Sequence, residues 1–217
     1  MDGPILLYFQ GILHSVATWL LIPTIIALLF LLALAVVELG GWLVEAVVER
    51  RRKKVSLPQL IDLFQGKDSV EIMTAIGQSP LFQRQKMILS ELICHEQLPL
   101  ESQKALARRL LATEEEHYAK ITDRTDLVAR LAPMFGLMGT LIPLGPGIIA
   151  LGQGDVQTLA DSLLIAFDTT VAGLAAAGVA FAISRLRKRW YRAQLDTLAA
   201  LMESLLEVFD HERGTKG

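Results

Sequence analysis

Two apolar runs within residues 131–184, separated only by the short polar bridge 152–155, constrain the fold of this chain more than any other feature. Each run is long enough to cross a bilayer, for which about twenty apolar residues suffice. Two such runs joined by so short a bridge predict a transmembrane helical hairpin. A further apolar stretch, residues 3–37, contains no Lys, Arg, Asp or Glu and predicts a third crossing.

Basic residues occupy only two blocks of the chain. No Lys or Arg precedes Arg50, and none lies between Arg130 and Arg185. Membrane proteins concentrate Lys and Arg in the segments that stay in the cytoplasm, so both blocks are predicted to be cytoplasmic. The N-terminus and the bridge near Asp155 then lie outside, which requires three crossings. Since 20% of the residues are charged, a substantial part of the chain must lie in water.

The charge and the cysteine content exclude several other classes. A formal net charge of −2 argues against a nucleic-acid partner, because such binding needs a basic surface. The single cysteine, Cys94, is interpreted as a buried thiol. Glu114, Glu115 and Glu116 fan around a helix and predict a solvated face rather than a metal site. We therefore expect no metal and no cofactor, and the sequence contains no nucleotide-binding loop motif.

These observations predict an all-α integral membrane protein with three transmembrane helices and long cytoplasmic helical extensions. The transmembrane helices are expected to contact membrane lipid. Its expected parts are an N-terminal interfacial segment (1–14), transmembrane helix 1 (15–39), a cytoplasmic helical block (50–126), transmembrane helix 2 (127–151), an external loop (152–158), transmembrane helix 3 (159–184) and a cytoplasmic C-terminal helix (185–217).

Helix start and stop signals divide the cytoplasmic block further. They predict short helices over 56–64, 68–77 and 79–97, followed by a long helix that begins near Leu100 and continues into the second crossing. The C-terminal helix carries an apolar seam that must pack against the earlier cytoplasmic helices or a neighbouring subunit. The seam consists of Leu195, Leu198, Met202, Leu205 and Phe209.

Small residues recur at helical spacing in both crossings of the hairpin. The second crossing carries Ala132, Gly136, Thr140, Pro143 and Gly147, and the third carries Ala166, Thr170, Gly173, Ala177, Ala180 and Ser184. Such stripes allow helices to pack closely, for which Gly136, Gly139, Gly173 and Ala177 are the candidates. They also suit the wall of a narrow channel, and the residues alone do not decide between the two interpretations.

Two carboxylates in the third crossing need an explanation, because a charge at membrane depth is costly. Asp168 lies about 200° around the helix from Thr170, so the two cannot face the same surface. Asp161 precedes Asp168 by two helical turns and shares its face. The acidic face is therefore interpreted either as a hydrogen-bonded structural lock or as a proton relay.

Two segments of the hairpin resemble the MotA/TolQ/ExbB proton-channel family. LAPMFGLMGTLIPLG, residues 131–145, contains the family's "GLxGT" pattern, and LLIAFDTTVAGLAAAG, residues 163–178, contains "TTxxGL". The resemblance implies that Thr140 and Thr170 match the threonines of the ion path, and that Thr169 matches the doubled threonine of the MotA branch.

The family likeness also implies partners and a function. It implies a homo-oligomeric ring, in the best-known cases a pentamer, around two copies of a single-span partner of the ExbD/TolR/MotB type that supplies an essential membrane aspartate. The chain would then be a subunit of an inner-membrane proton channel or motor, not an enzyme. It would convert the proton motive force into mechanical work, with its N-terminus outside and its C-terminus in the cytoplasm of a bacterium or archaeon.

Some positions depart from the family's pattern. Ile165 stands where the ExbB branch has a membrane glutamate, and Asp168 stands where a neutral residue is expected. The chain thus resembles a less characterised branch, in which Asp168 either replaces that glutamate from another face or acts as a local lock. The alternative function is a structural or scaffolding membrane subunit without ion conduction.

Overall fold

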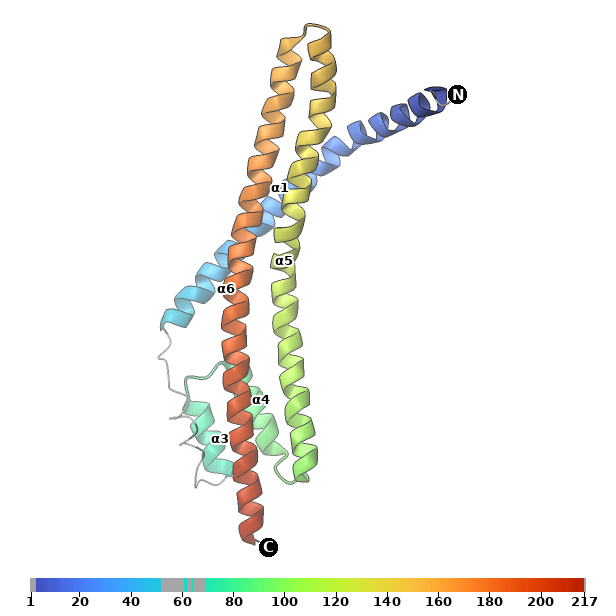
Figure 1. The fold of residues 1–217 in the computed structure, drawn as a ribbon. Helices are drawn as coiled ribbons and strands as arrows, with labels where there is room; N and C mark the ends of the chain where they lie inside the picture. The colour runs from blue at the N-terminus through green and yellow to red at the C-terminus, as the bar shows by residue number, and fades with distance from the viewer. Residues whose placement is uncertain (1–2, 52–60, 62–63, 65–68, 217) are drawn as a thin grey trace. The chain divides into compact units, whose positions relative to one another are not determined.

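The computed structural model describes residues 3–51, 61, 64 and 69–216. These form five helices: α1 (Gly3–Arg51), α3 (Ser69–Gln78), α4 (Gln83–Cys94), α5 (Leu100–Gly152) and α6 (Val156–Lys216) (Figure 1). Among the described residues, three helices are long and apolar enough to cross a membrane, and their candidate spans are Ser15–Val47, Leu100–Gly152 and Val156–His211. The predicted all-α fold with three transmembrane helices is confirmed.

The chain divides into two compact units, and α5 and α6 contribute to both. Residues 1–44 and 122–186 form the first, referred to below as the membrane unit. Residues 45–121 and 187–217 form the second, referred to as the bundle unit.

α1 is one continuous helix, with no break between the expected interfacial segment and the first crossing. It contains Pro23, which a membrane helix tolerates when neighbouring groups satisfy the freed carbonyl. Where the membrane boundary lies along α1 stays a prediction.

The turn between α5 and α6 is shorter than the expected external loop. Only residues 153–155 separate the two helices. Gly154 has a φ of 82°, a conformation that glycine adopts without steric cost. The Asp155 carboxylate then accepts hydrogen bonds from the Thr158 backbone N–H at 3.1 Å and the Thr158 hydroxyl at 2.5 Å, which caps the start of α6. The sequence itself therefore encodes a tight hairpin turn.

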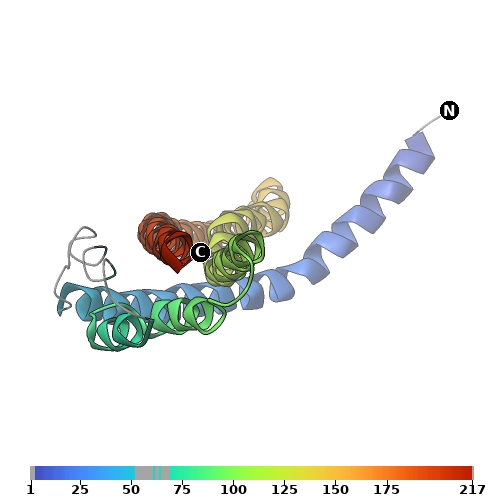
Figure 2. The same ribbon diagram turned by 90° about the horizontal axis from the view of Figure 1, so that it is seen from below.

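The bundle unit has its own hydrophobic core. Figure 2 shows α3 and α4 along one side of the α5 and α6 segments of this unit. The core joins apolar side chains of these four helices, and it includes most of the predicted α6 seam. Its buried members include Ile72, Leu89, Leu92, Ala107, Leu198, Leu201, Met202, Leu205 and Phe209.

The observed short helices correct several predicted boundaries. α3 lies one residue further along the chain than the predicted 68–77, while most of the predicted helix 56–64 lies outside the described residues. α4 begins at Gln83, four residues after the predicted start, because the Gln85 side chain accepts a hydrogen bond from the Phe82 backbone and caps the helix there. It ends early because the Gln103 amide donates to the carbonyls of His95 and Glu96.

Two side chains of the bundle unit contradict their sequence interpretations. Cys94, at the end of α4, is exposed rather than buried. Glu114 is buried rather than solvated, because the Arg84 guanidinium of α4 donates to both of its carboxylate oxygens at 2.7–3.1 Å. These hydrogen bonds raise the pKa of Arg84 above its ordinary value. The ion pair therefore attaches α4 to α5.

Candidate functional site

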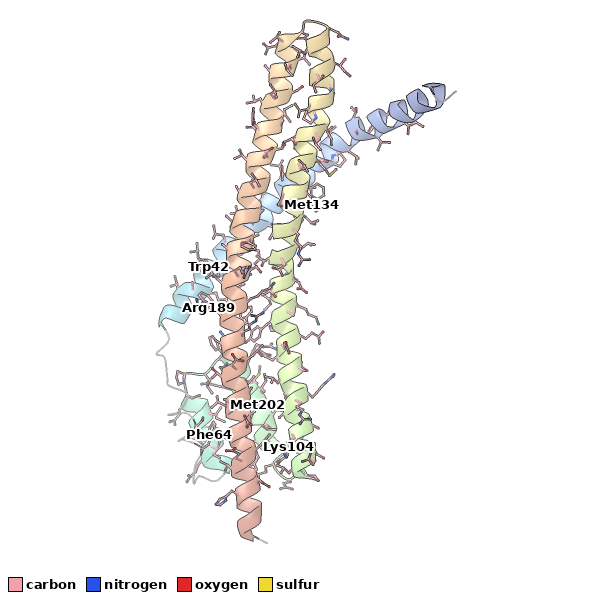
Figure 3. The ribbon with its side chains drawn as sticks, in the orientation of Figure 1. Trp42, Phe64, Lys104, Met134, Arg189 and Met202 are labelled. Carbon is pink, nitrogen blue, oxygen red and sulfur yellow. The ribbon has the colours of Figure 1, made fainter. Side chains whose placement is uncertain are left out.

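The hairpin helices of the membrane unit approach each other closely at glycines. A Cβ atom added to Gly173 of α6 would lie 2.8 Å from the Ala132 carbonyl oxygen and 3.0 Å from the Gly136 Cα, both in α5. Real Cβ atoms do not come this close to backbone, so only glycine fits. Figures 1 and 3 show α5 and α6 side by side along this contact. The small-residue stripes thus bring the two backbones into direct contact.

Thr169 belongs to this helix contact rather than to an open surface. Its side chain is only 7% exposed and lies against Gly139, where an added Cβ would be 2.6 Å from the Thr169 Cβ. Its hydroxyl donates to the carbonyls of Ile165 and Ala166 in its own helix. Thr169 therefore packs the hairpin from within.

Thr140 and Thr170 lie beside the contact and are half-buried. The Thr140 hydroxyl donates to the Leu137 carbonyl at 2.7 Å, and the Thr170 hydroxyl donates to the Ala166 carbonyl at 2.8 Å. A hydroxyl that donates in this way keeps its oxygen lone pairs available as acceptors. Both threonines can therefore receive a hydrogen bond from water or from another chain.

A second polar group joins the two helices at the other end of the hairpin. The Ser184 hydroxyl of α6 donates a short hydrogen bond to the Asp126 carboxylate of α5. Ser184 is only 3% exposed. Thr122 and Thr125, which precede Asp126 in α5, are buried as well. The sequence did not point to Asp126, because it is the last residue of the predicted cytoplasmic block and lies outside the apolar run of the second crossing.

This hydrogen bond shows on which side of the hairpin each α5 residue lies. Gly136 faces α6, since its added Cβ would approach Thr169 and Gly173. At about 100° per residue, Asp126 and Thr140 lie about 80° and 40° from Gly136 in the same rotational sense. Thr140 is therefore on the side of α5 that carries Asp126.

The same geometry applies to α6. Thr169 faces α5, and Ser184 and Thr170 lie about 60° and 100° from it in one rotational sense. Because Ser184 meets Asp126, this is the same side of the hairpin that carries Thr140. Thr140, Thr170 and the Asp126–Ser184 pair thus share one surface, referred to below as the threonine side.

α1 packs near the opposite side of the hairpin. Its residues Leu31 and Ala35 form a buried cluster with Val128 and Ala132 of α5. Val128 and Ala132 lie about 80° and 40° from Gly136 in the sense opposite to that of Asp126. The first crossing therefore packs with α5 on the side away from Asp126.

Comparison with known families identifies the hairpin. Residues 76–200, more than half of the chain and all of the hairpin, match the MotA/TolQ/ExbB proton channel family. The chain belongs to the MotA/TolQ/ExbB proton channel family. It is therefore a multi-pass membrane protein of a proton channel family. A comparison with curated proteins finds no match.

Asp161 and Asp168, the acidic residues in the hairpin segment of α6, do not lie on the threonine side of this MotA/TolQ/ExbB member. Asp168 and Asp161 lie about 100° and 80° from Thr169 in the sense opposite to that of Thr170. Both are exposed, and the Gln157 side chain donates to Asp161 at 3.3 Å. Asp168 is surrounded in sequence by exposed apolar residues, including Ile165 and Phe167. Its carboxylate is thus directed neither into the helix contact nor toward Thr170.

The bundle unit contains a second group of polar contacts, where α1 ends. The Glu45 carboxylate accepts a hydrogen bond from the Arg187 guanidinium at 3.3 Å and from the Tyr191 hydroxyl at 3.0 Å. Tyr191 stacks on Tyr118 of α5 with 4.3 Å between ring centroids. The Tyr118 hydroxyl donates to the Gln194 side chain at 3.0 Å. These contacts connect the end of α1 to α6 and α5 within this MotA/TolQ/ExbB family member.

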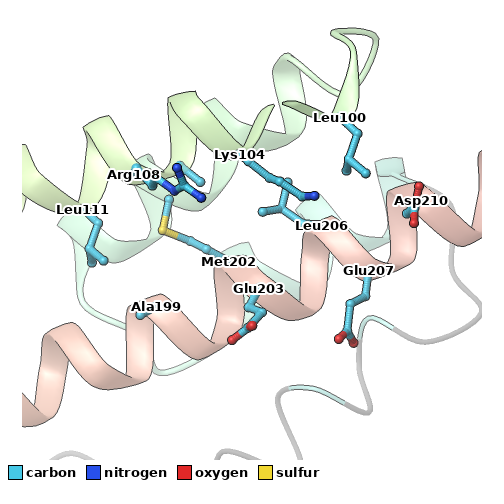
Figure 4. Close-up of a pocket in the computed structure, with 11 residues that line it drawn as sticks. Leu100, Lys104, Arg108, Leu111, Ala199, Met202, Glu203, Leu206, Glu207 and Asp210 are labelled. Carbon is cyan, nitrogen blue, oxygen red and sulfur yellow. The ribbon is translucent and has the colours of Figure 1, made fainter. Parts of the chain in front are cut away.

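The bundle unit also has an open groove of about 550 Å³ between α5 and α6 (Figure 4). Apolar residues such as Leu111 and Met202 line it, with Lys104 and Arg108 on the α5 side and Glu203 on the α6 side. The residues that line the groove include no serine, threonine, cysteine or histidine, and among the described residues no three His, Cys, Asp or Glu side chains gather as metal ligands do. The candidate functional site therefore remains the hairpin.

Proposed function

We propose that this chain is a ring-forming subunit of a proton-conducting channel or motor, in which the threonine side of the hairpin lines the ion path. The observation that carries the proposal is that Thr140 and Thr170, from different helices of a proton channel family member, flank the same surface. Their hydroxyls are half-buried and can accept hydrogen bonds, which suits a narrow, partly hydrated path.

A threonine hydroxyl can relay a proton but cannot store one at ordinary pH, so the path also needs a titratable group at this depth. Asp168 and Asp161 lie on the other side of α6 from Thr170. We therefore propose that a partner supplies the carboxylate. The resemblance implies two copies of a single-span protein of the ExbD/TolR/MotB type, enclosed by a ring that is a pentamer in the best-known cases. The partner helices would occupy the threonine side, opposite to the α5 residues Val128 and Ala132 that pack with α1.

The distribution of basic residues supports an orientation. Lys and Arg occur only in 50–130 and 185–217, which supports a cytoplasmic location for both blocks under the positive-inside rule. The N-terminus and the turn at Gly154 would then lie outside a bacterial or archaeal cytoplasmic membrane. Protons moving inward along the threonine side would do work on the partner, for example in a transport process.

Asp168 has a different proposed role. A carboxylate cannot face hydrocarbon without a large free-energy cost, so its exposure in the single chain indicates that another protein segment covers it in the membrane. Because it lies away from Thr170, we assign it to a contact with a neighbouring copy of the ring. Asp161, on the same face, would take part in this contact, and neither residue would carry the ion.

A flux measurement tests the proposed function. The chain would be purified with a single-span partner of the ExbD/TolR/MotB type from the same genome, and proton uptake into liposomes driven by a potassium diffusion potential would be followed with a pH-sensitive dye. We expect Thr140→Ala and Thr170→Ala each to lower the partner-dependent flux at least about tenfold.

Thr197→Ala is the matched control. Its hydroxyl also donates to the carbonyl four residues earlier in α6, but it lies in the bundle unit. We expect this variant to conduct like the wild type. If Thr140→Ala and Thr170→Ala also conduct like the wild type, the hairpin only packs, and the scaffolding alternative is correct.

A further inference from the structure

We infer that Asp126 is the carboxylate that passes the proton from the ion path to the cytoplasm. The inference rests on the proposed function and adds a residue to it. Asp126 lies in the membrane unit and is joined to Ser184 across the hairpin. No sequence pattern of the hairpin contains it, because it precedes the apolar run of the second crossing.

Asp126 lies on the side of the hairpin that the proposed ion path requires. Its hydrogen bond to Ser184 places it on the threonine side together with Thr140 and Thr170. Asp168, by contrast, lies on the other side of α6. Among these residues, Asp126 alone has a carboxylate on the surface proposed to line the path.

The depth of Asp126 along the hairpin also fits an exit to the cytoplasm. Asp126 precedes Thr140 by 14 residues, and Ser184 follows Thr170 by 14 residues. At 1.5 Å per residue, the Asp126–Ser184 pair therefore lies about 21 Å along the hairpin from the threonines, toward the ends that continue into the bundle unit. Arg124, Arg130 and Arg185 lie near this level, and basic residues of this kind mark the cytoplasmic boundary. Asp126 thus stands where an inward path reaches water.

Small residues lie on the threonine side between the level of the threonines and the level of Asp126. Counted from Gly136 and Thr169, the residues that fall on the threonine side between the threonines and Asp126 include Ala129, Pro133 and Ala177. Ala177 is already buried within the single chain, whereas Ala129 and Pro133 are half-buried, so water or a partner helix would meet these two α5 residues. A distance of about 21 Å is too long for direct proton transfer. Water molecules or partner side chains must therefore connect the threonines to Asp126.

The step itself is a simple proton relay. The proton released by the partner's carboxyl group passes through water to the Asp126 carboxylate, where an O–H bond forms. That bond breaks when the proton moves to cytoplasmic water, which regenerates the carboxylate. The Ser184 hydroxyl donates to the carboxylate oxygen and holds the side chain in place, which makes Ser184 a positioning residue.

The test separates a proton acceptor from a structural clamp. Asp126→Asn keeps an oxygen that can accept from Ser184 but cannot exchange a proton, whereas Asp126→Glu keeps the carboxylate on a longer side chain. Each variant is reconstituted with the partner in liposomes and compared with the wild-type chain. We expect Asp126→Asn to assemble normally and to lose proton flux at least about tenfold. Asp126→Glu is expected to recover much of that flux.

Asp123→Asn is the matched control, since it removes an exposed carboxylate one turn earlier in α5. It is expected to conduct like the wild type. Normal flux in Asp126→Asn, or an assembled Asp126→Glu variant that does not conduct, overturns the inference. If flux is lost in Thr170→Ala but kept in Asp126→Asn, only the role of Asp126 fails. If the wild type itself does not conduct protons with its partner, both the proposed function and the role of Asp126 fail.

Discussion

Gly139 of α5 lies so close to Thr169 of α6 that a Cβ on this glycine would come within 2.6 Å of the Thr169 Cβ. The methyl and hydroxyl groups of Thr169 are just as near, at 2.9 and 2.7 Å. The hairpin is therefore held together by a threonine that fills the space a side chain on α5 would occupy. This contact explains why the doubled threonines have different surroundings, with Thr169 inside the hairpin and Thr170 beside its surface.

The first prediction concerns this contact. Gly139→Ala is expected to destabilise the hairpin by about 1–3 kcal/mol, because overpacking forces the two helices apart. Thermal unfolding of the detergent-purified protein measures the change. Gly145→Ala in the same helix is the control, since an added Cβ there meets nothing within 4 Å. An unchanged melting temperature in Gly139→Ala would show that the helices do not approach as closely as described.

The second prediction concerns backbone rather than side-chain contact. Gly173→Ala is expected to lower the melting temperature more than Gly139→Ala does, because its new Cβ meets the Ala132 carbonyl and the Gly136 Cα, which cannot rotate away. Gly178→Ala in the same helix meets nothing within 4 Å and should be neutral or slightly stabilising, since alanine favours a helix by about 1 kcal/mol over glycine. A larger loss in Gly178→Ala than in Gly173→Ala would contradict this ranking.

Much of the fold could be predicted because the membrane imposes strong, local requirements. The length of the apolar runs and the absence of charge in 3–37 fix three crossings, and helical spacing marks Leu198, Met202, Leu205 and Phe209 as a buried seam. The start of α4 could not be predicted from Ser79 and Pro80, because the observed cap depends on the side chain of Gln85. The burial of Glu114 depends on Arg84, thirty residues away in the sequence.

The hairpin could be predicted less completely than the fold. Helical periodicity separates Asp168 from Thr170, but it does not say which side of α5 each of them lies beside. The answer required a contact between helices, namely Asp126 with Ser184, which relates the side of one helix to the side of the other. Small residues such as Gly139 are compatible with packing or with a channel wall, and only their distance to Thr169 distinguishes the two.

The third prediction uses the unequal burial of the Arg84–Glu114 ion pair. The Glu114 side chain is 2% exposed, whereas that of Arg84 is 45% exposed. Arg84→Met leaves a buried carboxylate without its cation and is expected to cost about 3 kcal/mol or more. Glu114→Gln leaves an arginine that can turn to water, so its cost should be smaller. Thermal unfolding of both variants and of the Arg84→Met/Glu114→Leu double variant measures the difference, and equal losses in the single variants would contradict the asymmetry.

The last prediction concerns Asp168, which is exposed in the single chain and which we propose to contact a neighbouring copy in the membrane. Asp168→Asn keeps hydrogen-bonding atoms in the same shape, so it is expected to preserve both ring assembly and proton flux. Asp168→Leu removes them and is expected to shift the protein to smaller species in size-exclusion chromatography with light scattering. If Asp168→Asn assembles fully but loses proton flux, Asp168 carries the ion rather than the subunit contact. That result would also require a path along the side of α6 opposite to Thr170, since a straight helix cannot present both residues to one lumen.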